Sequence, residues 1–351
     1  MKKILHPSRL YPIVLILLMY FVYECRQQTE KDKSKEVKDA LSEITGQAMG
    51  TQYKILYYGD STESINKTLI DSAFNAFNQE FSTYEEASTI SMLNKQDTLC
   101  GVSPSFIMIL DASKQVYELS DGYFDPTILP LVNAWGFGPE EHDRLPTDEE
   151  VDSLLAYTGM DKITWDESCV YKNNSGVTFD LNAIAKGYGV DMISELLLSH
   201  GIKNHMVEIG GEVIGRGKKP DDSFWRIGIE KPVRGERSLY AALTLDNIAM
   251  ASSGNYRNYY KKEGKIYSHT IDPHTGKPVE RSILSATIIA PECYMADAYA
   301  TACMAGGMDI AKMLLEHSDE IEGYLIYANE GTLETYTTEG LQKLVHEYES
   351  K

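Results

Sequence analysis

Apolar residues recur along the chain with two spacings, one typical of helices and one typical of strands. The helical spacing predicts helices over about residues 63–80, 104–120, 184–200 and 296–315, and Thr147 with Glu150 forms a capping-box pattern that starts another. Short runs rich in β-branched and aromatic residues predict strands at 53–58, 205–209, 225–230, 239–245, 265–271, 284–290 and 323–328. Because helices and strands do not alternate regularly, the pattern favours an α+β fold over a doubly wound parallel sheet.

The N-terminal pattern is that of an export signal. Lys2, Lys3 and Arg9 precede an apolar stretch over residues 13–23. Secretory signals carry roughly 7–15 apolar residues after a basic flank, whereas a membrane span needs roughly 20. Cys25 follows at the place where a bacterial lipoprotein signal carries its lipidated cysteine. We therefore expect a signal peptide over residues 1–24, with an uncleaved anchor as the alternative.

The next segment differs in composition from the rest. Residues 25–42 are polar and charged, which predicts a solvated tether, and residues 43–351 form one exported domain without an internal repeat. We expect this domain to be held on the outer, periplasmic side of the bacterial cytoplasmic (inner) membrane through a lipid on Cys25.

Composition and charge exclude several classes of protein. The chain is 43% hydrophobic and 24% charged, as globular proteins are. A net charge of −19 disfavours binding to nucleic acid. The 5 cysteines contain no C-x-x-C pair, which gives no signal for zinc, and we expect the four beyond Cys25 to lie buried as small apolar residues.

Several polar segments next to glycines could carry chemistry, although G-x-G-x-x-G and P-loop patterns are missing. Lys186, early in a predicted helix, suits an anion such as pyrophosphate, or it faces solvent. His269, between hydroxyls and an acid, could take a proton, or it is structural. Asp297 and Thr301 lie one helical turn apart and suit Mg²⁺ or Ca²⁺, or they serve the helix itself.

The order of these segments resembles the ApbE family, the FAD:protein FMN transferases. The matching stretches are Met49-Gly50-Thr51, Ser82-Thr83-Tyr84, Gly122-Tyr123-Phe124-Asp125, Pro130-Leu131-Val132, Trp135-Gly136-Phe137-Gly138, Asp180 through Gly189, Gly210-Gly211, Ser253-Gly254, Ser268 through Pro273 with Thr275-Gly276, and Ala296-Asp297-Ala298 to Thr301-Ala302. The resemblance implies an α+β, ApbE-like (T-fold-like) architecture of mixed helices and mainly antiparallel strands. It further implies FAD as a substrate and a divalent cation, Mg²⁺, as cofactor.

The resemblance also implies roles for individual residues. FAD would be bound by Met49, Tyr84, Tyr123, Phe124, Asp125, Asp180, Lys186 and Ile271. The cation would be held by the backbone oxygen of Ala183 and the side chains of Asp297 and Thr301. His269 would remove the proton from the acceptor hydroxyl, and we expect Asp272 to orient it.

These roles predict Mg²⁺-dependent transfer of FMN from FAD to a Thr or Ser hydroxyl of an acceptor flavoprotein subunit, with release of AMP. Two alternatives stay open. Water could take the place of the acceptor, which would make the protein an FAD pyrophosphatase. The chain could also bind FAD without catalysis, as a flavin-binding lipoprotein.

Overall fold

The computed structural model describes residues 19–20, 23–24, 26–27, 40–59, 65–139, 144–232, 238–255, 259–262 and 265–348. Cys25 and most of the predicted signal peptide and tether lie outside the described residues. Within the described ranges, no helix combines the length and apolar character that crossing a membrane requires.

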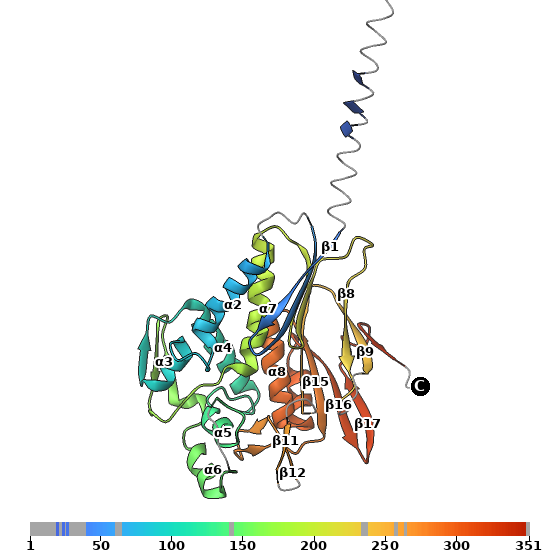
Figure 1. Ribbon diagram of the computed structural model, residues 1–351. Coiled ribbons are helices and arrows are strands. Elements are labelled where there is room, and N and C mark those ends of the chain that lie inside the picture. The colour runs from blue at the N-terminus through green and yellow to red at the C-terminus, as the bar shows by residue number, and fades with distance from the viewer. Residues whose placement is uncertain are drawn as a thin grey trace, which may run out of the picture.

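An eight-stranded antiparallel sheet forms the centre of the fold (Figure 1). Its strands, in spatial order, are β1 (Leu41–Ala48), β2 (Thr51–Tyr58), β6 (Asn204–Ile209), β7 (Glu212–Arg216), β10 (Ala249–Gly254), β15 (Ile283–Ala290), β16 (Glu322–Asn329) and β17 (Thr332–Thr337). Strand β1 begins at Leu41, inside the end of the segment expected to be a tether. Exposed and half-buried residues alternate along β1, so one face of this edge strand packs against the protein and the other faces solvent.

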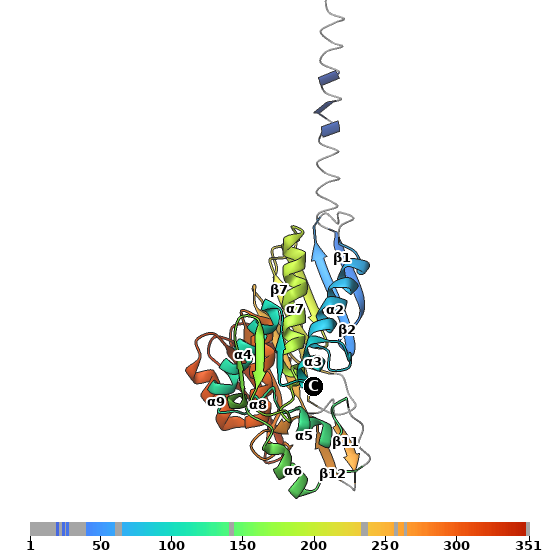
Figure 2. The ribbon, with the colours of Figure 1, turned by 90° about the vertical axis from the view of Figure 1, so that its left-hand side faces the viewer.

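Helices cover one face of this sheet (Figures 1 and 2). They are α2 (Lys67–Phe81), α3 (Thr89–Lys95), α4 (Pro104–Leu119), α7 (Asn182–Ser199), α8 (Cys293–Gly306) and α9 (Met308–His317). Two short helices, α5 (Leu129–Ala134) and α6 (Asp148–Leu155), lie beyond one end of this layer. A short 3-10 turn, η2, spans Met160–Lys162. Two apolar clusters fill the space between helices and sheet, and α8 is buried along most of its length.

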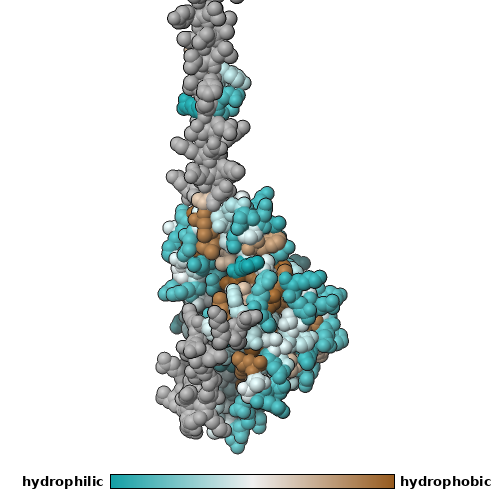
Figure 3. All heavy atoms as spheres, turned by 90° about the vertical axis from the view of Figure 1, so that its right-hand side faces the viewer, coloured by the Kyte–Doolittle hydropathy of each residue, from teal (hydrophilic) through white to brown (hydrophobic). Residues whose placement is uncertain are grey.

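A second layer covers the opposite face of the sheet. The strands β8 (Trp225–Glu230), β9 (Leu239–Leu245) and β18 (Val345–Glu347) form a small antiparallel sheet. Trp225 and Leu243 pack there against Met206, Val213 and Tyr324 of the large sheet. The outer surface of this side carries apolar side chains in separate groups among hydrophilic ones (Figure 3).

Three further pairings complete the fold. They are β3 (Thr98–Cys100), β4 (Ile163–Trp165) and β5 (Cys169–Lys172) in one sheet, β11 (Tyr259–Lys262) with β12 (Lys265–Ser268), and β13 (Ile271–Asp272) with β14 (Lys277–Pro278). The β11–β12 hairpin, α5 and α6 lie at the end of the molecule far from the start of β1 (Figure 1).

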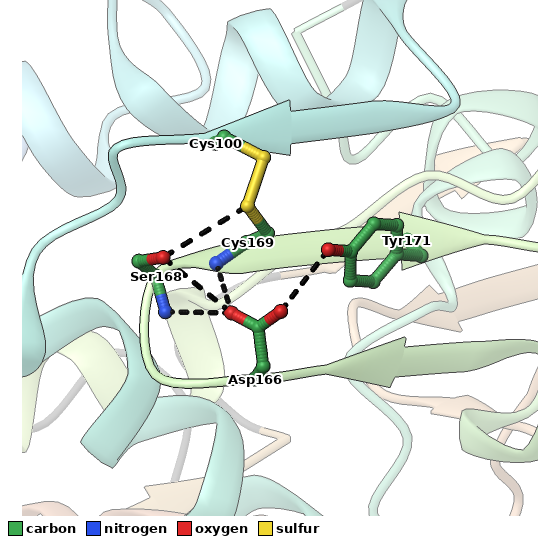
Figure 4. Close-up of a disulfide and its surroundings, with 5 residues drawn as sticks. All are labelled: Cys100, Asp166, Ser168, Cys169 and Tyr171. Atoms are coloured by element: carbon green, nitrogen blue, oxygen red, sulfur yellow. Dashed lines mark hydrogen bonds between the residues drawn. A yellow bond between two sulfur atoms is a disulfide. The ribbon is translucent and has the colours of Figure 1, made fainter.

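A disulfide joins Cys100 of β3 to Cys169 of β5 (Figure 4). Our expectation that these cysteines lie buried as small apolar residues is therefore wrong, because Cys100 is exposed and bonded. Cys293 and Cys303 are buried and free, as expected. Cys100 and Cys169 are 69 residues apart in sequence, and their pairing depends on strands that the sequence pattern did not predict.

Most predicted elements occur, with two clear differences. The strand expected over residues 265–271 is two strands, β12 and β13, separated by His269 and Thr270. The helix expected over residues 296–315 is two helices, α8 and α9, separated at Gly307. Gly307 has a φ of 82°, a conformation that ends a helix and that glycine adopts without strain. The capping box of Thr147 and Glu150 is present at the start of α6, as predicted.

Candidate active site

Helices α7 and α8 meet at a point where their backbones nearly touch. A Cβ placed on Gly187 would lie 2.4 Å from the carbonyl oxygen of Cys293, so a larger residue would push the helices apart. The Gly187 N–H donates to Asp297 Oδ2 at 3.0 Å. In an α-helix this N–H also faces the carbonyl of the residue one turn earlier, which is Ala183. The Ala183 carbonyl and the Asp297 carboxylate therefore both lie beside the Gly187 N–H.

Three charged side chains lie beside this contact. Lys186 Nζ is 2.7 Å from Glu212 Oε1 and 3.7 Å from Asp297 Oδ1. Burial raises the pKa of Asp297 to about 7, with the Lys186 charge opposing that rise and Glu212 adding to it. Burial works to lower the pKa of Lys186, but the carboxylates of Asp297 and Glu212 outweigh it and raise the value. The lysine predicted to meet pyrophosphate is thus paired with two acids.

These three groups leave an excess of negative charge. Two carboxylates share one ammonium, and Glu212 Oε2 is buried without a hydrogen-bond partner in the described structure. Among the described residues, no three His, Cys, Asp or Glu side chains are placed so that they could hold a metal ion together, so a cation here would also need carbonyl or hydroxyl oxygens. Ala183 and Thr301, one turn after Asp297, offer both, and such oxygens suit Mg²⁺.

Two aspartates lie on neighbouring segments. Ile128 and Thr178 form a parallel bridge, and the Asp180 N–H donates to the Pro126 carbonyl at 2.8 Å. Burial raises the pKa of Asp125, while hydrogen bonds from the Thr127 backbone and hydroxyl oppose the rise. Burial likewise raises the pKa of Asp180, which accepts from the Asn182 N–H at 2.8 Å. The structure thus brings these two predicted FAD residues together.

The remaining predicted FAD residues differ in exposure. Tyr84 is 71% exposed, as a ring open to a flat ligand would be. The Met49 side chain lies over Gly189 of α7, where an added Cβ would be 2.5 Å from Met49 Cε. Phe124 is 1% exposed and packs in the main core, so a ligand at this position would contact its backbone and not its ring. Ile271 is also buried and packs near Trp135.

His269 lies between β12 and β13, half-buried. The residues directly before and after His269 form hydrogen bonds to other segments. The Ser268 hydroxyl bonds to the Val279 carbonyl at 3.2 Å, and the Thr270 hydroxyl donates to Asn255 Oδ1 at 3.0 Å. Strand β13 contacts α8, so this loop and the Asp297 helix belong to one region.

The role of Asp272 in orienting His269 stays a prediction, and the described hydrogen bonds of its carboxylate involve the residues that follow β13. Asp272 Oδ1 accepts from the backbone N–H of His274 at 2.9 Å, and Oδ2 accepts from Arg281 Nη2 at 2.7 Å. Its carboxylate therefore shapes the turn that follows β13. This turn agrees with the sequence, since an Asp followed by a Pro and a Thr-Gly pair is a strong turn signal.

The same turn reaches across to the segment that carries Tyr123. The His274 ring stacks on the Tyr123 ring with centroids 4.3 Å apart, and His274 Nε2 lies 2.8 Å from the Asp121 carbonyl oxygen. The Arg281 guanidinium also lies 6.0 Å from the Tyr123 ring centre.

Sequence reasoning gave no role to Glu212, His274, Arg281 or Asp191. Glu212 follows a Gly-Gly pair at a strand start, and His274 lies in the same motif as His269. These two positions could have been chosen from the sequence because each lies in or beside a motif. The contacts themselves join residues far apart in the chain, which spacing along the sequence does not show.

Comparisons with known proteins bear on this arrangement. The family model described as "ApbE family" matches residues 49–325. The chain belongs to the ApbE family. This match covers every stretch on which the resemblance rested, from Met49 to the helix of Asp297.

Curated relatives and solved structures of the family agree. An FAD:protein FMN transferase of Vibrio cholerae is 36% identical over 301 residues, 84% of this chain and 90% of that protein. One of Haemophilus influenzae is 36% identical over 323 residues, 88% and 92% of the two chains. The structure of the flavin transferase ApbE from Vibrio cholerae superposes with a TM-score of 0.79 at 34% identity, covering 87% of this chain and 99% of that one. The family assignment and the α+β architecture predicted from sequence are thereby confirmed.

Proposed function

We propose that this ApbE-family transferase moves the FMN half of FAD onto a Thr or Ser hydroxyl of an acceptor protein and releases AMP. The observation that carries the proposal is the meeting of α7 and α8, where the Gly187 N–H donates to the buried Asp297 carboxylate, on a helix that also contacts the strand after His269. Curated relatives named FAD:protein FMN transferase over most of the chain support it.

Each group has a part in the proposed reaction. Tyr84 and Met49 bind the flavin ring, and the segments of Asp125 and Asp180 bind polar groups of FAD. The Ala183 carbonyl, Asp297 and Thr301 would hold Mg²⁺. When bound, this ion neutralises charge on the pyrophosphate oxygens. The positive charge of Lys186 offsets part of the negative charge of Asp297 and Glu212.

His269 supplies the acid–base chemistry. A threonine hydroxyl is a poor nucleophile near neutral pH and needs a base within hydrogen-bond reach. The imidazole takes the hydroxyl proton as the hydroxyl oxygen bonds to the FMN phosphorus. The bond from that phosphorus to the bridging oxygen breaks, and AMP leaves with its electron pair.

Transfer and hydrolysis are separated by one measurement. The full chain is mixed with FAD, Mg²⁺ and a threonine-bearing acceptor domain, and the mass of the acceptor and the amount of AMP are followed together. Transfer predicts one FMN on the acceptor for each AMP, and no AMP after chelation of the metal. Release of AMP with an unmodified acceptor, for every acceptor tried, would make the protein a pyrophosphatase.

We also propose that the enzyme works outside the cytoplasm as a lipoprotein held by Cys25. The disulfide between Cys100 and Cys169 supports export, because disulfides persist mainly in oxidising compartments. Mass spectrometry of the membrane-bound protein tests the anchor. A lipid on Cys25 as the first residue is expected, and an intact N-terminus ahead of Cys25 would contradict it.

A further inference from the structure

Helix α8 begins without a capping side chain of its own. Its N-cap residue, Glu292, makes no side-chain bond to the first turn. The first N–H groups of a helix have no partner inside the helix, and leaving them unpaired while buried is costly. Cys293, the first residue of α8, is fully buried.

Asp191 of α7 takes the place of that cap. The Cys293 N–H donates to Asp191 Oδ1 and the Tyr294 N–H donates to Asp191 Oδ2, each at 3.0 Å. A carboxylate with both oxygens on the first turn also faces the positive end of the helix dipole. Asp191 and the residues that it caps are separated by about a hundred positions in the chain, so this bond fixes one helix against another.

The bond has a counterpart one turn away on both helices. Gly187, one turn before Asp191 on α7, donates its N–H to Asp297, which lies one turn after Cys293 on α8. Each helix therefore gives backbone N–H groups to a carboxylate on the other. We call these bonds of Asp191 and Asp297 the α7–α8 clamp.

The clamp sets the place of the proposed cation ligands. Ala183 precedes Gly187 by one turn, and Thr301 follows Asp297 by one turn, so both are fixed once the helices are in register. Mg²⁺ demands near-ideal octahedral geometry at about 2.0–2.1 Å. A small slide of α8 along α7 would therefore separate the oxygens of the two helices by more than the ion tolerates.

We propose that Asp191 is a positioning residue for the cation site, acting through the start of α8 rather than by touching substrate or metal. The inference rests on the proposed function, because it assumes that Ala183, Asp297 and Thr301 hold the ion. The close backbone contact at Gly187 makes the register sensitive, since the helices are separated there by no side chain.

The test is Asp191→Asn, which keeps the shape of the side chain. An amide has one oxygen, so one of the two N–H groups at the start of α8 would face an NH₂ group instead of an acceptor. Binding of Mn²⁺ to the full chain, with FAD present, is measured from the EPR signal of the free ion. We expect affinity to fall about tenfold or more, as for other partners that orient metal ligands.

Asp166→Asn is a matched control. Asp166 also accepts two backbone N–H groups, from Ser168 and Cys169 at 2.9 Å each, but it lies in the turn beside the disulfide (Figure 4). The control should keep the Mn²⁺ affinity of the unchanged protein. FAD binding without metal should be the same in all three proteins.

The outcomes separate the inference from the proposed function. Unchanged Mn²⁺ affinity in Asp191→Asn would overturn the positioning role and leave the transferase proposal standing. Absence of Mn²⁺ binding in the unchanged protein with FAD would overturn the cation site and this inference together, and FMN transfer would still be scored separately. If Asp191→Asn does not fold, Asp191→Glu keeps both oxygens but moves them, and it should fold and bind Mn²⁺ more weakly.

Discussion

The ring of Tyr123 stacks on the ring of His274, with centroids 4.3 Å apart and planes 12° from parallel. The two residues come from segments that meet only in the folded chain. Tyr123 belongs to the segment predicted to bind FAD, and His274 lies in the turn that follows His269 and β13. The stack and the hydrogen bond between His274 Nε2 and the Asp121 carbonyl oxygen therefore join the turn after β13 to the segment predicted to bind FAD.

Removing this stack should weaken FAD binding. His274→Ala loses a ring contact of about 1 kcal/mol and a hydrogen bond of about 1 kcal/mol, so we expect the KM for FAD to rise by up to about thirtyfold with a smaller change in kcat. Lys277→Ala is the control, because Lys277 of the neighbouring strand β14 forms an exposed ion pair with Asp148 of α6. Equal KM values for the two variants would show that the stack does not organise the site.

The pair of Lys186 and Glu212 should stabilise the fold mainly by avoiding an unpaired buried charge. Lys186→Met leaves Glu212, which is 3% exposed, without its cation. We expect the free energy of unfolding to fall by about 3 kcal/mol, the low end for a broken buried pair, because the lysine side chain is 32% exposed.

A double variant tests this cause. Lys186→Met with Glu212→Gln removes the stranded charge, so urea unfolding should show a smaller loss than Lys186→Met alone. If the double variant loses as much as the sum of the two single variants, the residues are not coupled and the charge argument is wrong.

The disulfide should matter for the segment that it encloses. The loop between Cys100 and Cys169 contains α4, α5, α6 and the Tyr123–Asp125 segment. Closing a loop of this length stabilises a protein by about 4 kcal/mol in the chain-entropy model. Cys100→Ser with Cys169→Ser should therefore lower the free energy of unfolding by a comparable amount and weaken FAD binding.

Reductant supplies the control for that prediction. It should lower the stability of the unchanged protein toward that of the double variant and leave the double variant unaffected. A reduced protein with unaltered stability and FAD affinity would show that the closed loop is rigid without the bond.

His205 should make the protein sensitive to mild acid. Burial lowers the pKa of this histidine to about 4. Its Nδ1 lies 3.1 Å from the Ile202 carbonyl oxygen, which can only accept, so Nδ1 carries the proton and Nε2 accepts from the Ser194 hydroxyl at 2.7 Å. The unfolded chain takes up a second proton near pH 6.5, whereas the folded chain resists it until about pH 4.

The sign of the effect follows from linkage. Stability from this residue is full above pH 6.5 and is lost as the pH falls toward 4. Between about pH 7.5 and pH 5, urea unfolding should show that the unchanged protein loses about 2 kcal/mol more than His205→Asn. An identical pH dependence of the two proteins would mean that His205 accepts a proton in the folded state.

The sequence predicted the family and most long elements because periodicity and ordered motifs are local signals. It correctly predicted that Asp297 and Thr301 lie on one helix, because the apolar spacing around them is a local signal. It did not predict the Cys100–Cys169 bond, because the short strands β3 and β5 carry too few residues for a pattern. It did not predict the bond from Arg281 to Asp272 for a related reason, since that pair forms only in the folded chain.

The proposed transfer depends on His269 as the base that takes the proton of the acceptor hydroxyl. The most direct measurement compares the unchanged protein with His269→Ala at saturating FAD, Mg²⁺ and acceptor, and follows the mass of the acceptor and bound FAD together. We expect His269→Ala to bind FAD as tightly as the unchanged protein but to lose transfer by about a hundredfold or more, the usual contribution of a general base. Transfer at the unchanged rate by His269→Ala would contradict it.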